Sequence, residues 1–264
     1  MASGRPFLFG TNTKMHQTAD QTAAFVRELL AAPPPGDVQR FVIPPYTSLP
    51  AATAAVRAAD GDIWIGAQNM HWAESGAHTG EISAGMLLAL GVDLVLLGHA
   101  ERRRDAHETD AVLSKKVLSA VENGLRVLFC VGETADDRGC GVSAETVCRQ
   151  LKIGLLGVAP EQASLLQIAY EPVWSIGSGG VPADPADVEP VASLIRRTLS
   201  EVLGDDGERV PLLYGGSVDV SNAAGFAGLD DIDGLFVGRA AWSVDGFRAV
   251  LAAALAGRHP SAHA

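Results

Sequence analysis

The chain has few cysteines and no long hydrophobic run. Only three of its 264 residues are cysteines, at positions 130, 140 and 148, and none belongs to a C-x-x-C pair. An odd number without paired spacing argues against a disulfide framework and favours a reducing cytosol. No apolar stretch reaches the roughly eighteen residues that a membrane helix needs, and the segment MASGRPFLFG lacks the apolar core of a signal peptide. We therefore expect a cytoplasmic protein that does not enter a membrane.

Basic residues are also in short supply. Lysine and arginine total 20 against 31 aspartate and glutamate residues, so the net charge at pH 7 is -11. This acidic balance argues against a nucleic-acid-binding surface. It leaves room for an anionic small molecule, because a helix N-terminus or a local cationic group can bind phosphate within an acidic protein. The hydrophobic fraction of 47% is typical of a globular chain with a large core.

Short apolar runs recur along the chain, and each is followed by a longer segment with helical spacing. The runs are 7–9, 41–43, 63–67, 94–97, 127–131, 165–169, 212–214 and 235–237, and the helical segments are 17–32, 48–59, 81–90, 109–123, 144–157, 184–203, 219–227 and 243–257. Eight such repeats predict a (β/α)8 barrel, a single domain over residues 1–264 with a frayed tail after about residue 257. On pattern alone, a doubly wound open sheet is the alternative. It usually has fewer strands at this size, and no G-x-G-x-x-G follows the first run.

Polar and glycine residues follow most of the predicted strands, at the end where barrel enzymes carry their active sites. They are Asn12 and Lys14, Gln68 and Asn69, Gly98 with His99 and Glu101, Gly132 and Glu133, Glu171, Gly215 to Ser217, and Gly238 with Arg239. Each alone has an ordinary structural interpretation: a solvated lysine, a core histidine or a tight turn. Cys130 lies within an apolar run without an adjacent base, which favours a core position over a nucleophile. Because the polar residues end different strands, a single reaction centre explains them better together.

Several of these segments carry a family resemblance. The chain contains NTK (12–14), AQN (67–69), TGEIS (79–83), GHAERR (98–103), CVGE (130–133), YEPVWSIGSG (170–179) and YGGS (214–217). In this order and at matching strands, from about residue 8 to 243, they resemble the signature segments of the triosephosphate isomerase family. The resemblance implies a barrel enzyme that moves a proton between adjacent carbons of a small phosphorylated sugar, without a metal or an organic cofactor.

The resemblance also implies a role for each candidate residue. Glu171 would be the base, neutral His99 would polarise the carbonyl, and Lys14 with Asn12 would stabilise the enediolate. Glu101 would orient the site, and residues 172–180 would form a lid over the intermediate. The phosphate would be held by backbone N–H groups of Gly177, Ser217, Gly238 and Arg239 near a short helix N-terminus.

Departures from the ordinary family pattern bear on the substrate. Thr13 stands in place of a tryptophan, Ala100 in place of a serine, and Arg239 in place of a glycine. AQNMHW (67–72), GVPAD (180–184) and VGRAAW (237–242) are more similar to a branch of the family that acts on tetrulose phosphates. Such a substrate carries one extra hydroxymethyl group, and the smaller Thr13 and Ala100 would make room for it. We expect the Arg239 side chain to point outward, with only its backbone at the phosphate.

Other interpretations are an ordinary triosephosphate isomerase, a barrel kept only for binding, and a Schiff-base aldolase. The retained Glu171, His99 and Lys14 disfavour the binding protein, and the position of Lys14 in a loop disfavours the aldolase. The segment 70–83 resembles a loop that enters a partner subunit. It implies a homodimer in which Thr79 reaches across near Lys14. A long surface loop is the alternative.

Overall fold

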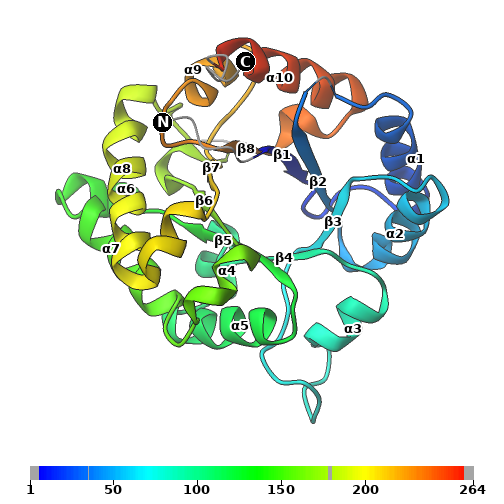
Figure 1. Cartoon of the computed structure of the whole chain (residues 1–264), viewed down its shortest axis with the longest axis horizontal. Helices are drawn as coiled ribbons and strands as arrows, with labels where there is room; N and C mark the ends of the chain where they lie inside the picture. The colour runs from blue at the N-terminus through cyan, green and yellow to red at the C-terminus, as the bar shows by residue number, and fades with distance from the viewer. Residues whose placement is uncertain (1–5, 35, 178–179, 259–264) are drawn as a thin grey trace.

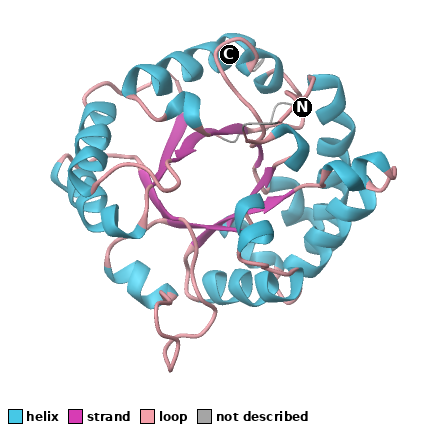
Figure 2. Cartoon of the chain, turned by 180° about the vertical axis from the view of Figure 1, so that it is seen from behind, coloured by secondary structure: helices cyan, strands magenta, loops and turns pink. Residues whose placement is uncertain are grey.

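The computed structural model describes residues 6–34, 36–177 and 180–258. Eight parallel strands pair in chain order, and β1 closes the sheet against β8. The strands are β1 (Phe7–Asn12), β2 (Val38–Ile43), β3 (Trp64–Ala67), β4 (Leu94–Leu97), β5 (Arg126–Val131), β6 (Leu166–Tyr170), β7 (Leu212–Tyr214) and β8 (Gly234–Val237). Figure 1 looks through this ring, and Figure 2 shows from the other side that the helices surround the strands. The predicted (β/α)8 barrel is confirmed.

Ten α-helices lie outside the strands within the described residues. They are α1 (Ala19–Leu30), α2 (Leu49–Ala58), α3 (Ala84–Ala89), α4 (Ala100–Asp105), α5 (Asp110–Glu122), α6 (Ala135–Gly139), α7 (Ser143–Gly154), α8 (Pro185–Leu203), α9 (Ala223–Ala227) and α10 (Val244–Gly257). Short 3-10 turns occur as well, among them η3 (Val173–Ser175) and η5 (Arg239–Ala241). The sequence predicted the eight main helices with small errors at their ends, and it missed α4 and α6. The tail expected to fray lies outside the described residues from position 259 onward.

Side-chain caps define where many of these helices begin. The capping residues are Thr18, Ser83, His99, Thr109, Thr134, Asp184 and Ser243, each of which accepts a hydrogen bond from a backbone N–H of the first turn. A cap of the usual Ser, Thr or Asp type contributes about 1 kcal/mol. The loops between strands and helices therefore end at defined positions.

The strands alternate between two buried clusters. In β4, Leu94 and Leu96 join a small cluster with Phe41, Leu128 and Phe236, whereas Val95 and Leu97 join the larger cluster formed with the helices. Successive strand side chains point to opposite faces, so the small cluster fills the barrel and the large one packs under the helices. Burial on both faces explains why the strands appear in the sequence as continuous apolar runs. The polar residues that follow the strands lie at the rim formed by the strands' carboxyl ends.

None of the described helices is both long and apolar enough to cross a membrane.

Candidate active site

His99 stands at the start of α4 because Gly98 turns the chain sharply after β4. Gly98 has a φ of 77°, and a Cβ there would lie 2.9 Å from the Cys130 carbonyl oxygen, so glycine suits this turn. The His99 ring is buried, and its Nδ1 accepts a hydrogen bond from the Glu101 backbone N–H at 3.2 Å. An Nδ1 that accepts carries no proton, so the ring proton of the neutral imidazole lies on Nε2.

Glu171 follows β6 and is only 2% exposed. Its Oε1 lies 3.8 Å from His99 Nε2, which is too long for a hydrogen bond. Its Oε2 accepts from the Ala100 backbone N–H at 3.4 Å. The backbone of Gly132 and Gly215 approaches closely: a Cβ on Gly132 would lie 1.9 Å from the Glu171 carbonyl oxygen, and one on Gly215 would lie 2.9 Å from Glu171 Cγ. Gly132 therefore lets the Glu171 backbone pass and Gly215 makes room for its side chain; the sequence had placed both glycines at the polar rim.

Cys130 lies beside that carboxylate inside the barrel. Burial, together with the negative charge of Glu171, raises the pKa of the Cys130 thiol well above its usual value. A thiol in this state is a poor nucleophile. Cys130 is buried and free, in agreement with the core position expected from the sequence.

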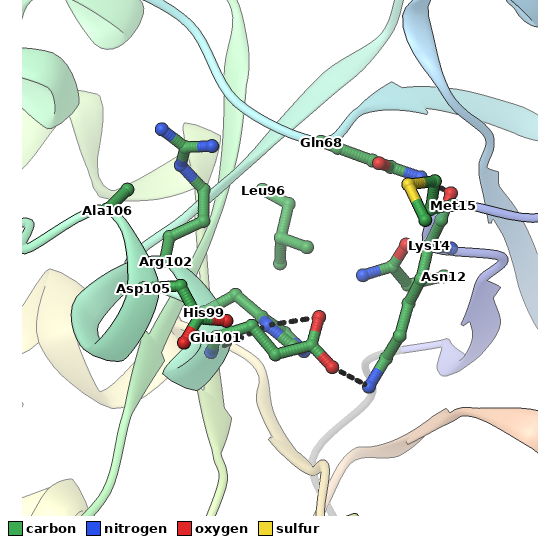
Figure 3. Close-up of a pocket in the computed structure, with 10 residues that line it drawn as sticks. All are labelled: Asn12, Lys14, Met15, Gln68, Leu96, His99, Glu101, Arg102, Asp105 and Ala106. Atoms are coloured by element: carbon green, nitrogen blue, oxygen red, sulfur yellow. Dashed lines mark hydrogen bonds and ion pairs between the residues drawn. The ribbon is translucent and has the colours of Figure 1, made fainter.

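Lys14 occupies an uncommon backbone conformation just beyond β1. Its φ is 52°, in the left-handed region that residues with a Cβ seldom adopt. Two side chains hold this backbone: Asn12 Oδ1 accepts from the Lys14 N–H at 2.8 Å, and Gln68 Nε2 donates to the Lys14 carbonyl at 2.8 Å. Lys14 Nζ forms an ion pair with Glu101 Oε1 at 2.7 Å. Figure 3 shows the two side chains meeting beside His99.

Two surface cavities meet at Lys14. The first has a volume of about 310 Å³ and is drawn in Figure 3; its lining residues include Asn12, Lys14, Gln68, Leu96, His99, Glu101 and Arg102. The second has a volume of about 490 Å³ and contains all four predicted phosphate residues; its lining includes Lys14, Gly177, Ser217, Gly238, Arg239 and Trp242. Arg239 is exposed. Glu171, Thr13 and Ala100 line neither cavity.

Thr13 is fully buried and Ala100 is 8% exposed, and neither lines the two cavities. The expectation that these small side chains make room for a larger substrate stays a prediction. The free space beside His99 is bounded by Gln68, Leu96 and Arg102.

The segment predicted as a lid begins beside Glu133, which the sequence placed at the polar rim without assigning it a role. Glu133 is 2% exposed and accepts hydrogen bonds from Trp174 Nε1 at 2.7 Å and from the Tyr170 hydroxyl at 3.2 Å. The Arg138 guanidinium lies 3.8 Å from the centre of the Trp174 ring. Burial and the charge of Glu133 raise the pKa of Tyr170, so this phenol stays a donor. A glutamate directly after a buried strand was the available signal. Residues 178 and 179 of the predicted lid lie outside the described residues.

In the part of the chain that the structure describes, no three His, Cys, Asp or Glu side chains are grouped so that they could hold a metal ion.

Comparison with known proteins agrees with this geometry. The family described as triosephosphate isomerase matches residues 7–254. The chain belongs to the triosephosphate isomerase family. It is accordingly an isomerase of the intramolecular oxidoreductase type.

Relatives within the family have two different names at similar identity. L-erythrulose-1-phosphate isomerase of Rhizobium etli is 44% identical over 248 residues, which cover 92% of this chain and 90% of the relative. Triosephosphate isomerase of Acetivibrio thermocellus is 41% identical over 247 residues, which cover 93% of this chain and 97% of the relative. The crystal structure of triosephosphate isomerase from Bartonella henselae superimposes with a TM-score of 0.84 at 32% identity, covering 94% of this chain and 99% of that one.

Proposed function

We propose that the protein interconverts L-erythrulose 1-phosphate and D-erythrulose 4-phosphate through an enediolate. The observation that carries this proposal is the meeting of a carboxylate, a neutral imidazole and an ammonium group, Glu171, His99 and Lys14, at one rim of the barrel. These are a base, a proton donor and a positive charge, which the transfer of a proton next to a carbonyl requires.

Each group has a defined part in the reaction. Glu171 removes the proton from the carbon beside the ketone, and the C–H electron pair becomes the double bond of the enediolate. The His99 Nε2–H donates toward the oxygen that gains negative charge, and the Lys14 ammonium stabilises that charge. His99 gives its proton to that oxygen and takes the hydroxyl proton from the neighbouring oxygen, which becomes the new ketone. Return of the carbon-bound proton from Glu171 to the former carbonyl carbon completes the isomerisation. Glu171 Oε2 accepts a hydrogen bond from the Ala100 N–H. The carboxylate therefore has to leave this bond and turn toward the substrate when the substrate binds.

Asn12 and Glu101 support the same centre. Asn12 Oδ1 holds the Lys14 backbone, while Glu101 provides the N–H that fixes the His99 tautomer and the carboxylate that pairs with Lys14. Substrate negative charge would compete with Glu101 for the ammonium group. Glu101 therefore keeps Lys14 in place until the substrate arrives.

The phosphate belongs in the second cavity, beside Gly177, Ser217, Gly238 and Arg239. Glycines at two of these positions let a ligand approach the backbone closely. Because the Arg239 side chain is exposed, we assign the phosphate contact to the Arg239 backbone N–H and not to its guanidinium. The sugar carbons then extend past Lys14 toward the first cavity.

The choice of a tetrulose phosphate rests on two supports. The Rhizobium etli relative is named for that substrate. The first cavity, beside His99, also offers space bounded by Gln68 and Leu96, where an additional hydroxymethyl group could lie. The second candidate is the interconversion of dihydroxyacetone phosphate and glyceraldehyde 3-phosphate, which the 41% identical Acetivibrio thermocellus relative favours.

A homodimer and a cytoplasmic location complete the proposal. The segment between β3 and α3 extends well beyond the ring of helices (Figure 1), and residues 74–81 at its tip are exposed. Met15, next to Lys14, is 94% exposed. A second subunit that covers both would remove this apolar side chain from water. The cytoplasmic location rests on three cysteines that are all free.

A direct comparison of substrates tests the proposal. Purified protein is assayed on L-erythrulose 1-phosphate, D-erythrulose 4-phosphate and glyceraldehyde 3-phosphate under one set of conditions. We expect a higher kcat/KM with the tetrulose phosphates. Equal or better efficiency with the triose phosphate would make the protein a triosephosphate isomerase, and no turnover of any of the three would favour a binding protein.

A further inference from the structure

Trp242 lines the second cavity and is hydrogen-bonded to Asn12, which lines the first, although no role for it follows from the chemistry above. It comes directly after η5, four residues beyond Gly238, and its half-buried side chain lines the second cavity together with Lys14. The loop before it is tightly turned, since the Ala241 N–H donates to the Gly238 carbonyl at 3.0 Å and the Trp242 N–H donates to the Arg239 carbonyl at 3.2 Å. The Trp242 backbone is therefore fixed relative to the phosphate-side loop.

The Trp242 indole N–H bonds to β1 just beyond the point where the pairing of β1 with β8 ends. The β1–β8 pairing ends with Thr11 opposite Val237, so Asn12 has no partner residue in β8. Trp242 Nε1 donates to the Asn12 carbonyl at 2.8 Å. It thereby ties the end of β1 to the loop that follows β8.

Two further contacts bind the loop after β1 to the same tryptophan. The His16 ring packs on the indole with a centroid distance of 4.3 Å, and Gln17 Nε2 donates to the Trp242 carbonyl at 3.0 Å. The loop that carries Lys14 is thus held on both sides of that lysine, by Asn12 before it and by His16 and Gln17 after it.

The Lys14 backbone depends on such support. Its left-handed φ of 52° is uncommon for a residue with a Cβ, and strained conformations persist only where the surroundings determine them. Asn12 Oδ1 accepts the Lys14 N–H, so any shift of Asn12 is passed on to Lys14. Trp242 donates to the Asn12 carbonyl, so it acts on Lys14 indirectly, through Asn12.

We propose that Trp242 is a positioning residue that sets the place of the Lys14 ammonium and couples it to the phosphate-side loop. This inference rests on the proposed function, because it assigns Lys14 to the enediolate and the loop around Gly238 to the phosphate. A phosphate seated against that loop fixes Trp242, and Trp242 fixes Asn12 and with it Lys14. The loop that binds the substrate phosphate then also orients the Lys14 ammonium group at the other end of the substrate.

Trp242→Phe tests the proposal, because phenylalanine keeps a ring against His16 and loses the N–H donor. We expect kcat to fall about tenfold, as a small misplacement of a catalytic group does, while KM changes less than twofold. Replacement of Trp242 by benzothienylalanine, which has the shape of tryptophan without its N–H, should give the same result. Trp64→Phe is the matched control, because Trp64 lies at the start of β3 under Arg126, and it should leave both constants unchanged.

Two ligands separate positioning from a general loss of structure. Inorganic phosphate probes only the phosphate side, and its affinity should stay within twofold in Trp242→Phe. The affinity of 2-phosphoglycolate, whose carboxylate would face Lys14, should fall several-fold. Equal losses for both ligands, or no loss for either, would overturn the proposal.

A double-mutant cycle supplies the last criterion. If Trp242 acts through Lys14, then Trp242→Phe should change kcat less than twofold when Lys14 is already methionine. A full tenfold loss in that background would mean that Trp242 acts elsewhere. Absence of turnover in the wild-type protein would contradict the proposed function, whereas the two ligand affinities would still decide the role of Trp242.

Discussion

Replacement of Lys14 by methionine should separate activity from stability. The Lys14–Glu101 pair is partly exposed, with 25% and 40% of the two side chains accessible. Exposed pairs contribute about 0–1 kcal/mol to folding. With an unfolding entropy of about 2.1 cal/mol/K for each residue, 264 residues give about 0.55 kcal/mol/K. Loss of the pair should then lower the melting temperature by about 2 °C or less.

The effect on catalysis should be much larger. Two unit charges about 4 Å apart interact by about 4 kcal/mol at an effective dielectric constant of 20, which corresponds to about a thousandfold in rate. We therefore expect Lys14→Met to lower kcat/KM by 10² to 10³ on the preferred substrate. The measurements are steady-state kinetics and thermal unfolding on the same preparation.

A matched control removes a similar ion pair away from the site. Lys152 Nζ lies 2.8 Å from Glu201, and both side chains are more than half exposed. Lys152→Met should change neither kcat/KM nor the melting temperature beyond the limits above. If Lys14→Met kept kcat/KM within tenfold of the wild type, the assignment of Lys14 to the enediolate would be wrong.

Further predictions concern the base, the proton donor, one buried histidine and the protruding loop. Glu171→Gln can keep the hydrogen bond from Ala100, so it should fold normally and lose about 10²–10⁴-fold in kcat; near-normal turnover would refute its role as the base. His99→Ala should lower kcat far more than the affinity for 2-phosphoglycolate; a change in KM alone would make it a binding residue. Burial and the nearby His78 lower the pKa of His71, so the unfolded chain binds this proton more readily. Acidification through the usual histidine pKa of about 6.5 should therefore reduce stability, and His71→Gln should weaken this pH dependence of thermal unfolding more than a change at exposed His107. Deletion of residues 71–76 should yield a weakly active monomer, and an intact dimer in sedimentation would exclude this loop as the main interface.

The barrel could be predicted from the sequence because every strand is buried on both faces. The run LVLL at 94–97 is apolar throughout, as a strand between the interior cluster and the helices must be. The helix α4 could not be predicted in the same way. Its sequence AERRRD has no apolar face, and it forms because His99 caps it and Gly98 turns the chain into it.

The candidate site was only partly accessible to the same reasoning. Motifs identify Lys14, His99 and Glu171, but not the contacts that hold them. Asn12 and Trp242 are 230 positions apart, and no local pattern relates them. The burial of Thr13 and Ala100 likewise depends on neighbours from distant segments.

Closure of the sheet by its first and last strands has a consequence for synthesis of the chain. A ribosome releases β1 first, yet its partner β8 emerges more than two hundred residues later. Until then both β1 and the newest strand are open sheet edges, which tend to pair with other chains. The nascent chain would therefore need chaperones or rapid helix coverage to protect these edges. The rim around Lys14 is also assembled last, because Trp242, whose indole N–H bonds the Asn12 carbonyl at the end of β1, follows β8 in the chain.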